Sequence, residues 1–144
     1  EIIRSINTIP LSIDDSLKVE VELEGVLYSP TFSVKSSDEK FIWSSVKSLE
    51  TNSNLVFLAF QIFSSKSDEL SDLTQLQKWG FEVPITLRTE DPMQVMIWHS
   101  QWMNNELFLN FPTNGIVAKC NSSSTKDFLG FSSSSPNWAL ALTR

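Results

Sequence analysis

The chain has 144 residues, of which 41% are hydrophobic and 19% are charged, and these values exclude a disordered chain and fit one globular domain. The formal net charge of −6 opposes partners bound mainly through charge, so we expect no nucleic acid and little attraction to anionic lipid. The single cysteine, Cys120, excludes an internal disulfide and favours a reducing, cytoplasmic location.

The first half of the chain is expected to be built from strands. Residues 1–11 fit neither a strand nor a helix clearly, whereas 17–23 alternates apolar and polar residues, as a strand with one wet face does. Residues 32–34 and 41–46 suggest two further short strands between turns. The run 55–63 is apolar on both alternating faces and predicts a strand buried from both sides.

A short helical segment is expected next. Leu70, Leu73 and Leu76 recur every three residues, and acidic residues crowd the start of the segment, where a helix dipole favours them. This pattern predicts one or two helical turns near residues 67–77. The alternation then resumes over 79–87, and because proline removes a ladder donor, Pro84 places this expected strand at a sheet edge.

The last third of the chain is expected to return to strands. Residues 94–98 and 106–111 suggest a hairpin with a loose loop, and 116–119 suggest a last short strand. About eight short strands predict an antiparallel β-sandwich with a helical insertion near 67–77. We expect residues 1–144 to form a single domain and, because the chain does not begin with methionine, to be a fragment of a longer chain.

Few residues could support catalysis. The lone histidine, His99, could act with Cys120 or a serine, but no sequence context marks a nucleophile, so a rim histidine is the preferred interpretation. The scattered aspartates lack the spaced cluster of a calcium loop. We therefore expect a non-catalytic protein with no cofactor and no bound metal.

Exposed aromatic and sulfur-containing side chains are the candidate interaction residues. Trp102 and Met103 are predicted to lie in a polar loop, and Trp98 precedes them, although core packing is the simpler role for Trp98. Phe128 and Phe131 are expected to anchor a mobile serine-rich loop. The tentative interaction surface comprises Trp98, Trp102, Met103, Phe128 and Phe131.

Several segments resemble one known family. Arg4–Ile6 stands where that family has a basic and isoleucine stretch, and Thr31–Val34 with Phe41–Ser45 resembles its second and third strands. Leu76–Trp79 and Asn105–Gly115 resemble later strands. The family is the C2-type domain of the UV-resistance-associated and yeast vacuolar-sorting subunits of class III phosphatidylinositol 3-kinase complexes.

This resemblance implies a non-catalytic, calcium-independent interaction module in membrane trafficking or autophagy. A Beclin-type subunit and the lipid kinase would be its partners, through regions outside this chain. Weak membrane contact would come from an apolar tip, and the complex would lie peripherally on endosomal membranes.

Two alternatives remain open at this point. The domain could be a structural sandwich that heads a scaffold and binds a partner protein at a sheet edge. It could also be a carbohydrate-binding sandwich that uses Trp98, Trp102 and the Asn104-Asn105 pair, because aromatic faces stack on sugars while amides supply hydrogen bonds.

Overall fold

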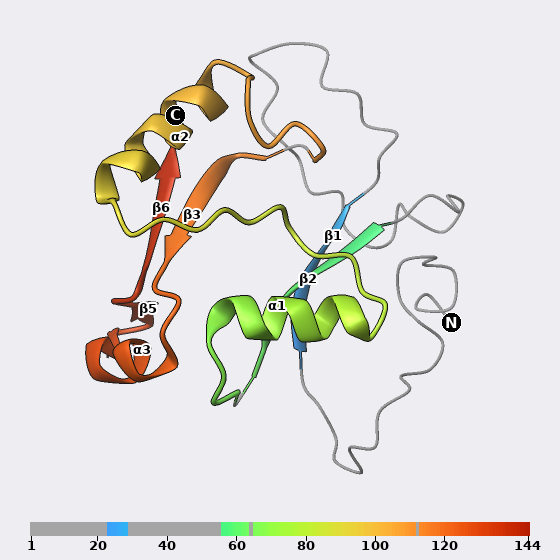
Figure 1. Ribbon diagram of the computed structural model, residues 1–144, viewed down its shortest axis with the longest axis vertical. Coiled ribbons are helices and arrows are strands. Elements are labelled where there is room, and N and C mark those ends of the chain that lie inside the picture. The colour runs from blue at the N-terminus through green and yellow to red at the C-terminus, as the bar shows by residue number, and fades with distance from the viewer. Residues whose placement is uncertain (1–22, 29–55, 64, 112) are drawn as a thin grey trace. The chain divides into compact units, whose positions relative to one another are not determined.

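The computed structural model describes residues 23–28, 56–63, 65–111 and 113–144 (Figure 1), and the chain divides into two compact units, Glu1–Pro84 and Ile85–Arg144. Its described residues form three two-stranded sheets and three helices. Of the strand expected over 17–23 only Leu23 is described, as the first residue of a strand, and the strands expected over 32–34 and 41–46 lie outside the described residues. The eight-stranded sandwich and the single domain therefore stay predictions.

The first unit packs a helix against a strand pair. Strand β1 (Leu23–Tyr28) pairs antiparallel with β2 (Val56–Ile62), and α1 (Glu69–Lys78) packs on β2, where the leucine spacing predicted a helical segment. Acidic residues lie in the first turn of α1 and Lys78 in its last turn, as the helix dipole favours. The buried core cluster consists of Ala59, Leu73, Leu76 and Trp79.

The alternating segment 79–87 forms no ladder of its own. Trp79 caps the C-terminus of α1, and the chain turns back as the Phe81 amide donates to the Leu76 carbonyl at 3.0 Å. A single parallel bridge then joins Glu82 to Leu58 on β2. Phe81 and Val83 pack partly buried against the core. Within 79–87 only Glu82 takes part in a bridge, so the prediction of a strand over this segment is wrong.

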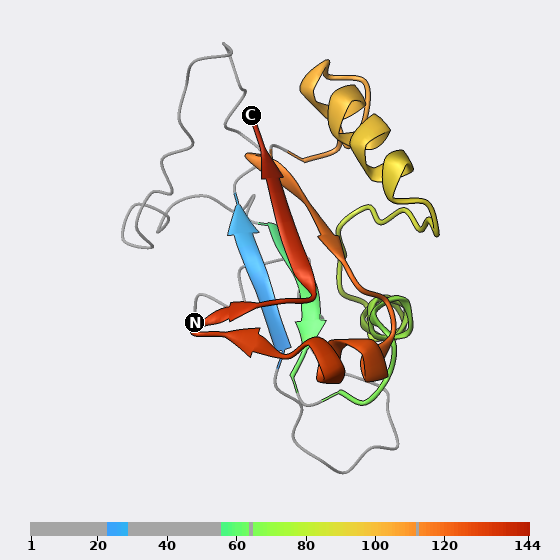
Figure 2. The same ribbon diagram turned by 90° about the vertical axis from the view of Figure 1, so that its left-hand side faces the viewer.

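The second unit joins a helix to a strand pair. It contains α2 (Pro92–Met103), β3 (Gly115–Lys119) and β6 (Ala139–Thr143), and β3 pairs antiparallel with β6 (Figure 2). The chain between the two strands carries α3 (Ser123–Leu129), β4 (Phe131–Ser132) and β5 (Ser135–Pro136). Helix α2 contacts β3.

The strand expected over 94–98 is wrong, because these residues lie inside α2. The residues at the start of α2 favour a helix over a strand. The Asp91 carboxylate accepts the Met93 amide at 2.9 Å, and Pro92 occupies the first turn, where its missing N–H costs nothing. Residues 106–111 form turns instead of the second hairpin strand, with Phe108 at a φ of 58°.

Gly25 supports the first strand pair through the absence of a side chain. The register of β1 and β2 shifts between Glu24 and Gly25, and a Cβ on Gly25 would overlap the Phe57 ring and the Leu58 carbonyl oxygen. We expect Gly25→Ala to lower the free energy of unfolding by about 1–3 kcal/mol, as overpacking does. Urea unfolding followed by circular dichroism measures this, with the exposed Glu24→Ala as control. An unchanged midpoint for Gly25→Ala would contradict the close packing.

Candidate functional site

The hairpin of β3 and β6 forms the backbone of the candidate site. Lys119 lies opposite Ala139 in the register, and the Cys120 amide donates to the Trp138 carbonyl at 2.9 Å, which extends the ladder by one step. At the other end, a Cβ on Gly115 would lie 2.6 Å from the Leu142 carbonyl oxygen, so glycine permits the close approach of the strands.

The connection between these strands, residues 120–138, is termed the hairpin connection and is held together by its own contacts. The Ser122 hydroxyl accepts the Thr125 amide at 3.3 Å and caps α3. The Asn137 side chain donates to the Leu129 carbonyl at 2.9 Å, and its amide donates to the Gly130 carbonyl at 2.9 Å. Three hydrogen bonds therefore hold parts of the connection to one another.

Trp138 is the centre of the hairpin connection. The ammonium of Lys126 lies 4.6 Å from the centroid of its ring, and the Phe131 ring meets it edge to face, with centroids 6.1 Å apart. Both contacts follow the quadrupole of the indole, whose face attracts cations. Lys119 and Lys126 are both half-buried, whereas Lys66 and Lys78 in the first unit are exposed.

The other end of the unit is organised by Trp102. Its Nε1–H donates to Thr113 Oγ1 at 2.6 Å, the His99 ring stacks on it at 5.8 Å, and the Arg144 guanidinium lies 5.4 Å from its centroid. His99 Nε2 is 3.0 Å from the Thr143 carbonyl oxygen, so this nitrogen carries a proton and donates. His99 thus joins α2 to β6.

The expected exposed position of Trp102 is wrong. The residue lies on α2 and is only 5% exposed, because the segment taken for a loop continues the helix to Met103. Met103 is 40% exposed and Trp98 is half-buried on the same helix. Phe128 and Phe131 are exposed on the hairpin connection. The interaction role of these residues stays a prediction.

Residues with metal-binding or nucleophilic chemistry are sparse in the part of the chain that the structure describes. Within it, no group of three His, Cys, Asp or Glu side chains could hold a metal ion. Cys120 is half-buried next to the end of β3. Three of the scattered aspartates, Asp14, Asp15 and Asp38, lie outside the described residues. No helix among the described ones has the length and hydropathy to cross a membrane.

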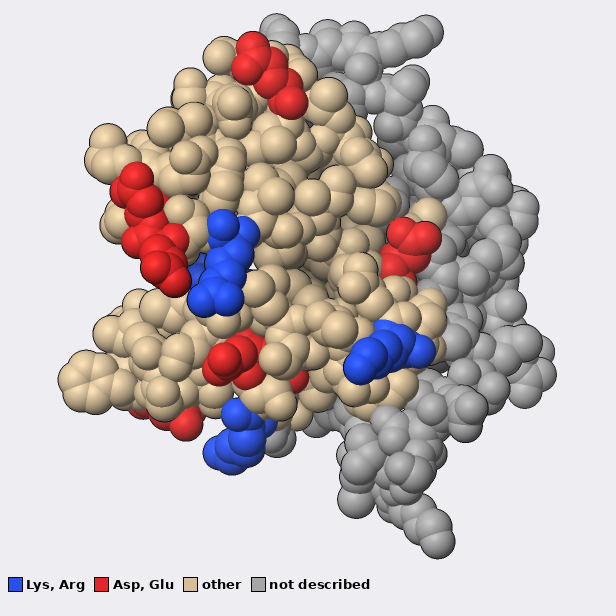
Figure 3. Space-filling model, in the orientation of Figure 1, with Lys and Arg blue, Asp and Glu red and all other residues tan. Residues whose placement is uncertain are grey.

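The net charge is distributed unevenly along the chain. Residues 85–144 contain four Lys or Arg and four Asp or Glu, so the whole formal charge of −6 belongs to residues 1–84. Within the second unit, the stretch from β3 to Arg144 carries Lys119, Lys126 and Arg144 against Asp127 alone. Figure 3 shows acidic and basic side chains set among a larger uncharged area on the face that it draws.

Sequence reasoning missed Lys119, Lys126 and Trp138 as a group. The sequence does show a lysine at the end of the apolar segment Gly115–Lys119 and a second lysine in the segment that follows, and this pattern could have indicated the two lysines. Their partner Trp138 lies beyond the serine-rich stretch, so only the pairing of β3 with β6 brings the three residues to one end of the hairpin.

The chain is similar to a known family of enzymes. The model of the NAD-dependent DNA ligase adenylation domain matches residues 45–143, which is about two thirds of the chain. The DNA ligase of Christiangramia forsetii is 30% identical over 76 residues, which are 52% of this chain and 11% of that protein. The DNA ligase of Bacteroides fragilis is 35% identical over 71 residues, 49% of this chain and 11% of that protein.

The DNA ligase of Ehrlichia chaffeensis is 36% identical over 70 residues, 48% of this chain and 10% of that protein. The matched part of the chain therefore spans about a tenth of the length of these relatives. The whole matched range of the family model includes α1, α2 and the β3–β6 hairpin with its connection.

These matches overturn several expectations. The resemblance to the C2-type domain of lipid-kinase subunits is wrong, and with it the trafficking and autophagy role, the endosomal association and the Beclin-type and kinase partners. The scaffold and carbohydrate-binding alternatives have no support. The expectation of a non-catalytic protein is wrong, because the relatives are DNA ligases, which are enzymes. The expectation that the protein has no nucleic-acid partner is also wrong, because this family acts on DNA. The cytoplasmic location stays a prediction.

Proposed function

The chain belongs to the family of NAD-dependent DNA ligase adenylation domains, and we propose that it works as part of such a domain, binding NAD⁺ for adenylyl transfer in the joining of DNA. The observation that carries this proposal is the family match over residues 45–143. The activity of a whole ligase belongs to a chain about ten times as long as the matched segment. The proposal therefore concerns the nucleotide-binding contribution of this chain.

Adenylyl transfer from NAD⁺ determines which protein groups the site needs. When bound, NAD⁺ supplies an adenylyl group, whose transfer breaks the pyrophosphate linkage, forms a new bond to phosphorus and releases nicotinamide mononucleotide. A protein group that faces the pyrophosphate must offset two negative charges. Lysine is a frequent phosphate ligand because it carries a compact positive charge on a long stem.

Lys119 is the described residue that fits this requirement best. It is half-buried at the end of β3, where reduced contact with water strengthens its attraction for a phosphate. The strand pair holds its backbone in register opposite Ala139. Its task in the proposal is to bind and orient the phosphates of NAD⁺, with the hairpin as a rigid support.

Lys126 is a weaker candidate for the same task. Its ammonium lies 4.6 Å from the centroid of the Trp138 ring. Lys119 ranks first because it stands in the β3–β6 ladder, whereas Lys126 lies on α3 in the hairpin connection.

Isothermal titration calorimetry with NAD⁺ tests the proposal. We expect the wild-type chain to bind NAD⁺ and Lys119→Met to weaken this binding by about tenfold or more, since hydrogen bonds to charged groups contribute about 1.5–3 kcal/mol. The matched control is Lys78→Met, which removes an exposed lysine from the last turn of α1. Methionine keeps most of the length of the lysine stem in both variants.

Mass spectrometry of the intact chain after incubation with NAD⁺ would detect covalent transfer as the mass of one adenylyl group. Absence of NAD⁺ binding by the wild-type chain would refute the proposed function. Equal affinities of Lys119→Met and Lys78→Met for NAD⁺ would refute only the role of Lys119 and would leave the proposed function standing.

A further inference from the structure

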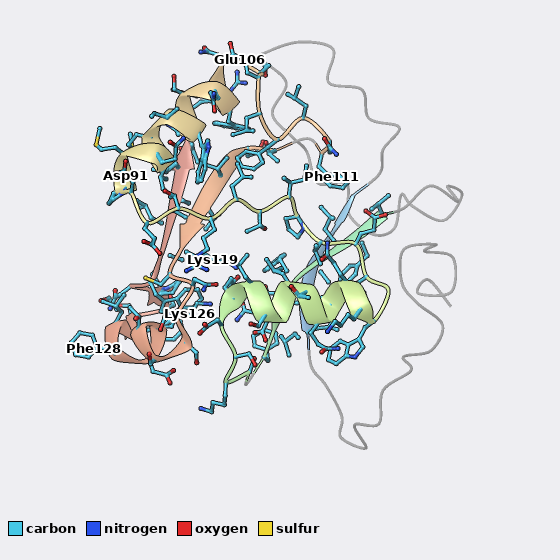
Figure 4. The ribbon with its side chains drawn as sticks, in the orientation of Figure 1. Asp91, Glu106, Phe111, Lys119, Lys126 and Phe128 are labelled. Atoms are coloured by element: carbon cyan, nitrogen blue, oxygen red, sulfur yellow. The ribbon has the colours of Figure 1, made fainter. Side chains whose placement is uncertain are left out.

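An asparagine and a glycine stand side by side at the start of β3. Of the four glycines in the chain, only Gly115 follows an asparagine, Asn114. Figure 4 labels Phe111 ahead of β3 and Lys119 at the last residue of the strand, and Asn114 lies in the chain between them. Asn114 is exposed, and the ladder with β6 begins only at Gly115. An accessible asparagine side chain thus precedes the first residue of the strand.

The backbone amide of Gly115 is not used in the strand pair. Pairs in an antiparallel ladder alternate between those that exchange hydrogen bonds and those that do not. The Cys120 amide donates to the Trp138 carbonyl at 2.9 Å, one step beyond the last pair of the ladder. The pair of Gly115 with Thr143 lies an odd number of steps from this bond, so it is one of the pairs without hydrogen bonds.

An asparagine next to such an amide can react with it. The Gly115 nitrogen attacks the side-chain carbonyl carbon of Asn114 and closes a succinimide ring, while the bond from that carbon to the side-chain NH2 breaks. The proton of the Gly115 amide leaves with the NH2 group as ammonia. Water then opens the ring at either carbonyl by giving OH to the carbon and a proton to the nitrogen. The product is aspartate or isoaspartate, whose carboxyl group ionises.

We propose that Asn114 is a modification site, at which spontaneous deamidation places a carboxylate at this end of the β3–β6 hairpin. Arg144 lies at the same end, directly after β6. Its guanidinium donates to Asn105 Oδ1 at 3.3 Å and lies 5.4 Å from the centroid of the Trp102 ring. The new carboxylate competes with these two contacts for Arg144, because hydrogen bonds between two charged groups are the stronger ones.

The isoaspartyl product also changes the backbone. It adds one methylene group to the main chain directly before Gly115, where a Cβ would lie 2.6 Å from the Leu142 carbonyl oxygen. The close approach of the strands at this glycine leaves little room for a longer main chain. The isoaspartyl form therefore loosens the start of the strand pair, whereas aspartate changes only the charge.

Incubation of the chain at mildly alkaline pH, followed by trypsin digestion and tandem mass spectrometry, tests the site. Asn110 is the internal control, because it is exposed, lies in the same tryptic peptide and is followed by Phe111 instead of glycine. We expect Asn114 to exchange its side-chain NH2 for OH at least about tenfold faster than Asn110, because glycine has no side chain to hinder its nitrogen. Asn114→Gln should abolish the fast conversion, since glutamine would have to close a larger ring.

Two outcomes would overturn the modification site. One is an equal rate of conversion at Asn114 and Asn110. The other is fast conversion in urea without conversion in the folded chain, because the fold would then protect Asn114. Neither measurement uses NAD⁺ or DNA, so this inference fails or stands separately from the proposed function.

Hydrogen exchange of peptides from β3 and β6 tests the effect on the backbone. The isoaspartyl form is separated from the unmodified chain by anion exchange and is compared with Asn114→Asp, which carries the same charge on a normal main chain. We expect exchange at least about threefold faster in the isoaspartyl form, because local opening of the strand pair costs less free energy. Equal exchange of the two forms would overturn the loosening of the strand pair.

Discussion

Replacement of Trp102 by alanine is expected to lower the free energy of unfolding by about 3–5 kcal/mol, the largest effect of any single substitution considered for the second unit. Trp102 is 5% exposed, and its ring meets His99 from α2 and Arg144 beyond the end of β6. Its removal leaves a cavity and removes the contact between α2 and Arg144. A loss of this size is a large share of the stability of a small domain.

Trp102→Phe separates packing from hydrogen bonding in this prediction. Phenylalanine keeps an aromatic ring but loses the Nε1–H bond to Thr113 Oγ1, so we expect a smaller loss of about 1–2 kcal/mol. Thr113 is exposed, and its hydroxyl can bind water instead. Urea unfolding with hydrogen exchange of peptides from α2 and β3 measures both variants. Similar losses for alanine and phenylalanine would contradict the packing role.

In the first unit, Leu76→Ala is expected to lower the free energy of unfolding by about 2–5 kcal/mol. Leu76 is 0% exposed and lies in the cluster formed with Ala59, Leu73 and Trp79. The fixed pairing of β1 with β2 and the turn after α1 limit how far the surroundings can collapse into the cavity. The size of the loss depends on that collapse.

Gln77→Ala is the control for Leu76→Ala. Gln77 is the next residue of α1 and is exposed, so its replacement should change stability by less than about 0.5 kcal/mol. Hydrogen exchange of peptides from α1 and β2 should show faster exchange in Leu76→Ala only. Equal exchange in the two variants would contradict the position of Leu76 at the centre of the core.

The net charge of the whole chain conceals an uneven distribution. The value of −6 disfavoured nucleic acid when it was applied to all 144 residues. The acidic excess belongs to residues 1–84, and residues 85–144 are balanced. Phosphate binding responds to potential within about one Debye length, roughly 10 Å, so local charge decides it. The total charge could not exclude DNA for the second unit.

Local patterns determined part of the fold. The spacing of Leu70, Leu73 and Leu76 predicted α1, the apolar run 55–63 predicted β2, and 116–119 predicted β3. These patterns succeed because the period of the apolar residues follows the geometry of the element itself. The prediction of a strand over 94–98 is wrong because a short apolar run fits a strand and a helix equally well, and only the Asp91-Pro92 pair before it marks the start of a helix.

The sequence by itself determined that the chain has apolar segments of helical and extended period and only one histidine and one cysteine. The tertiary structure alone decided that Trp102 is buried, that Phe128 is exposed, and that Lys126 lies over Trp138. The physical reason is that burial and side-chain contact depend on which distant segments pair. Lys126 and Trp138 meet because β3 and β6 form a ladder across the connection between them, and no local period encodes that pairing.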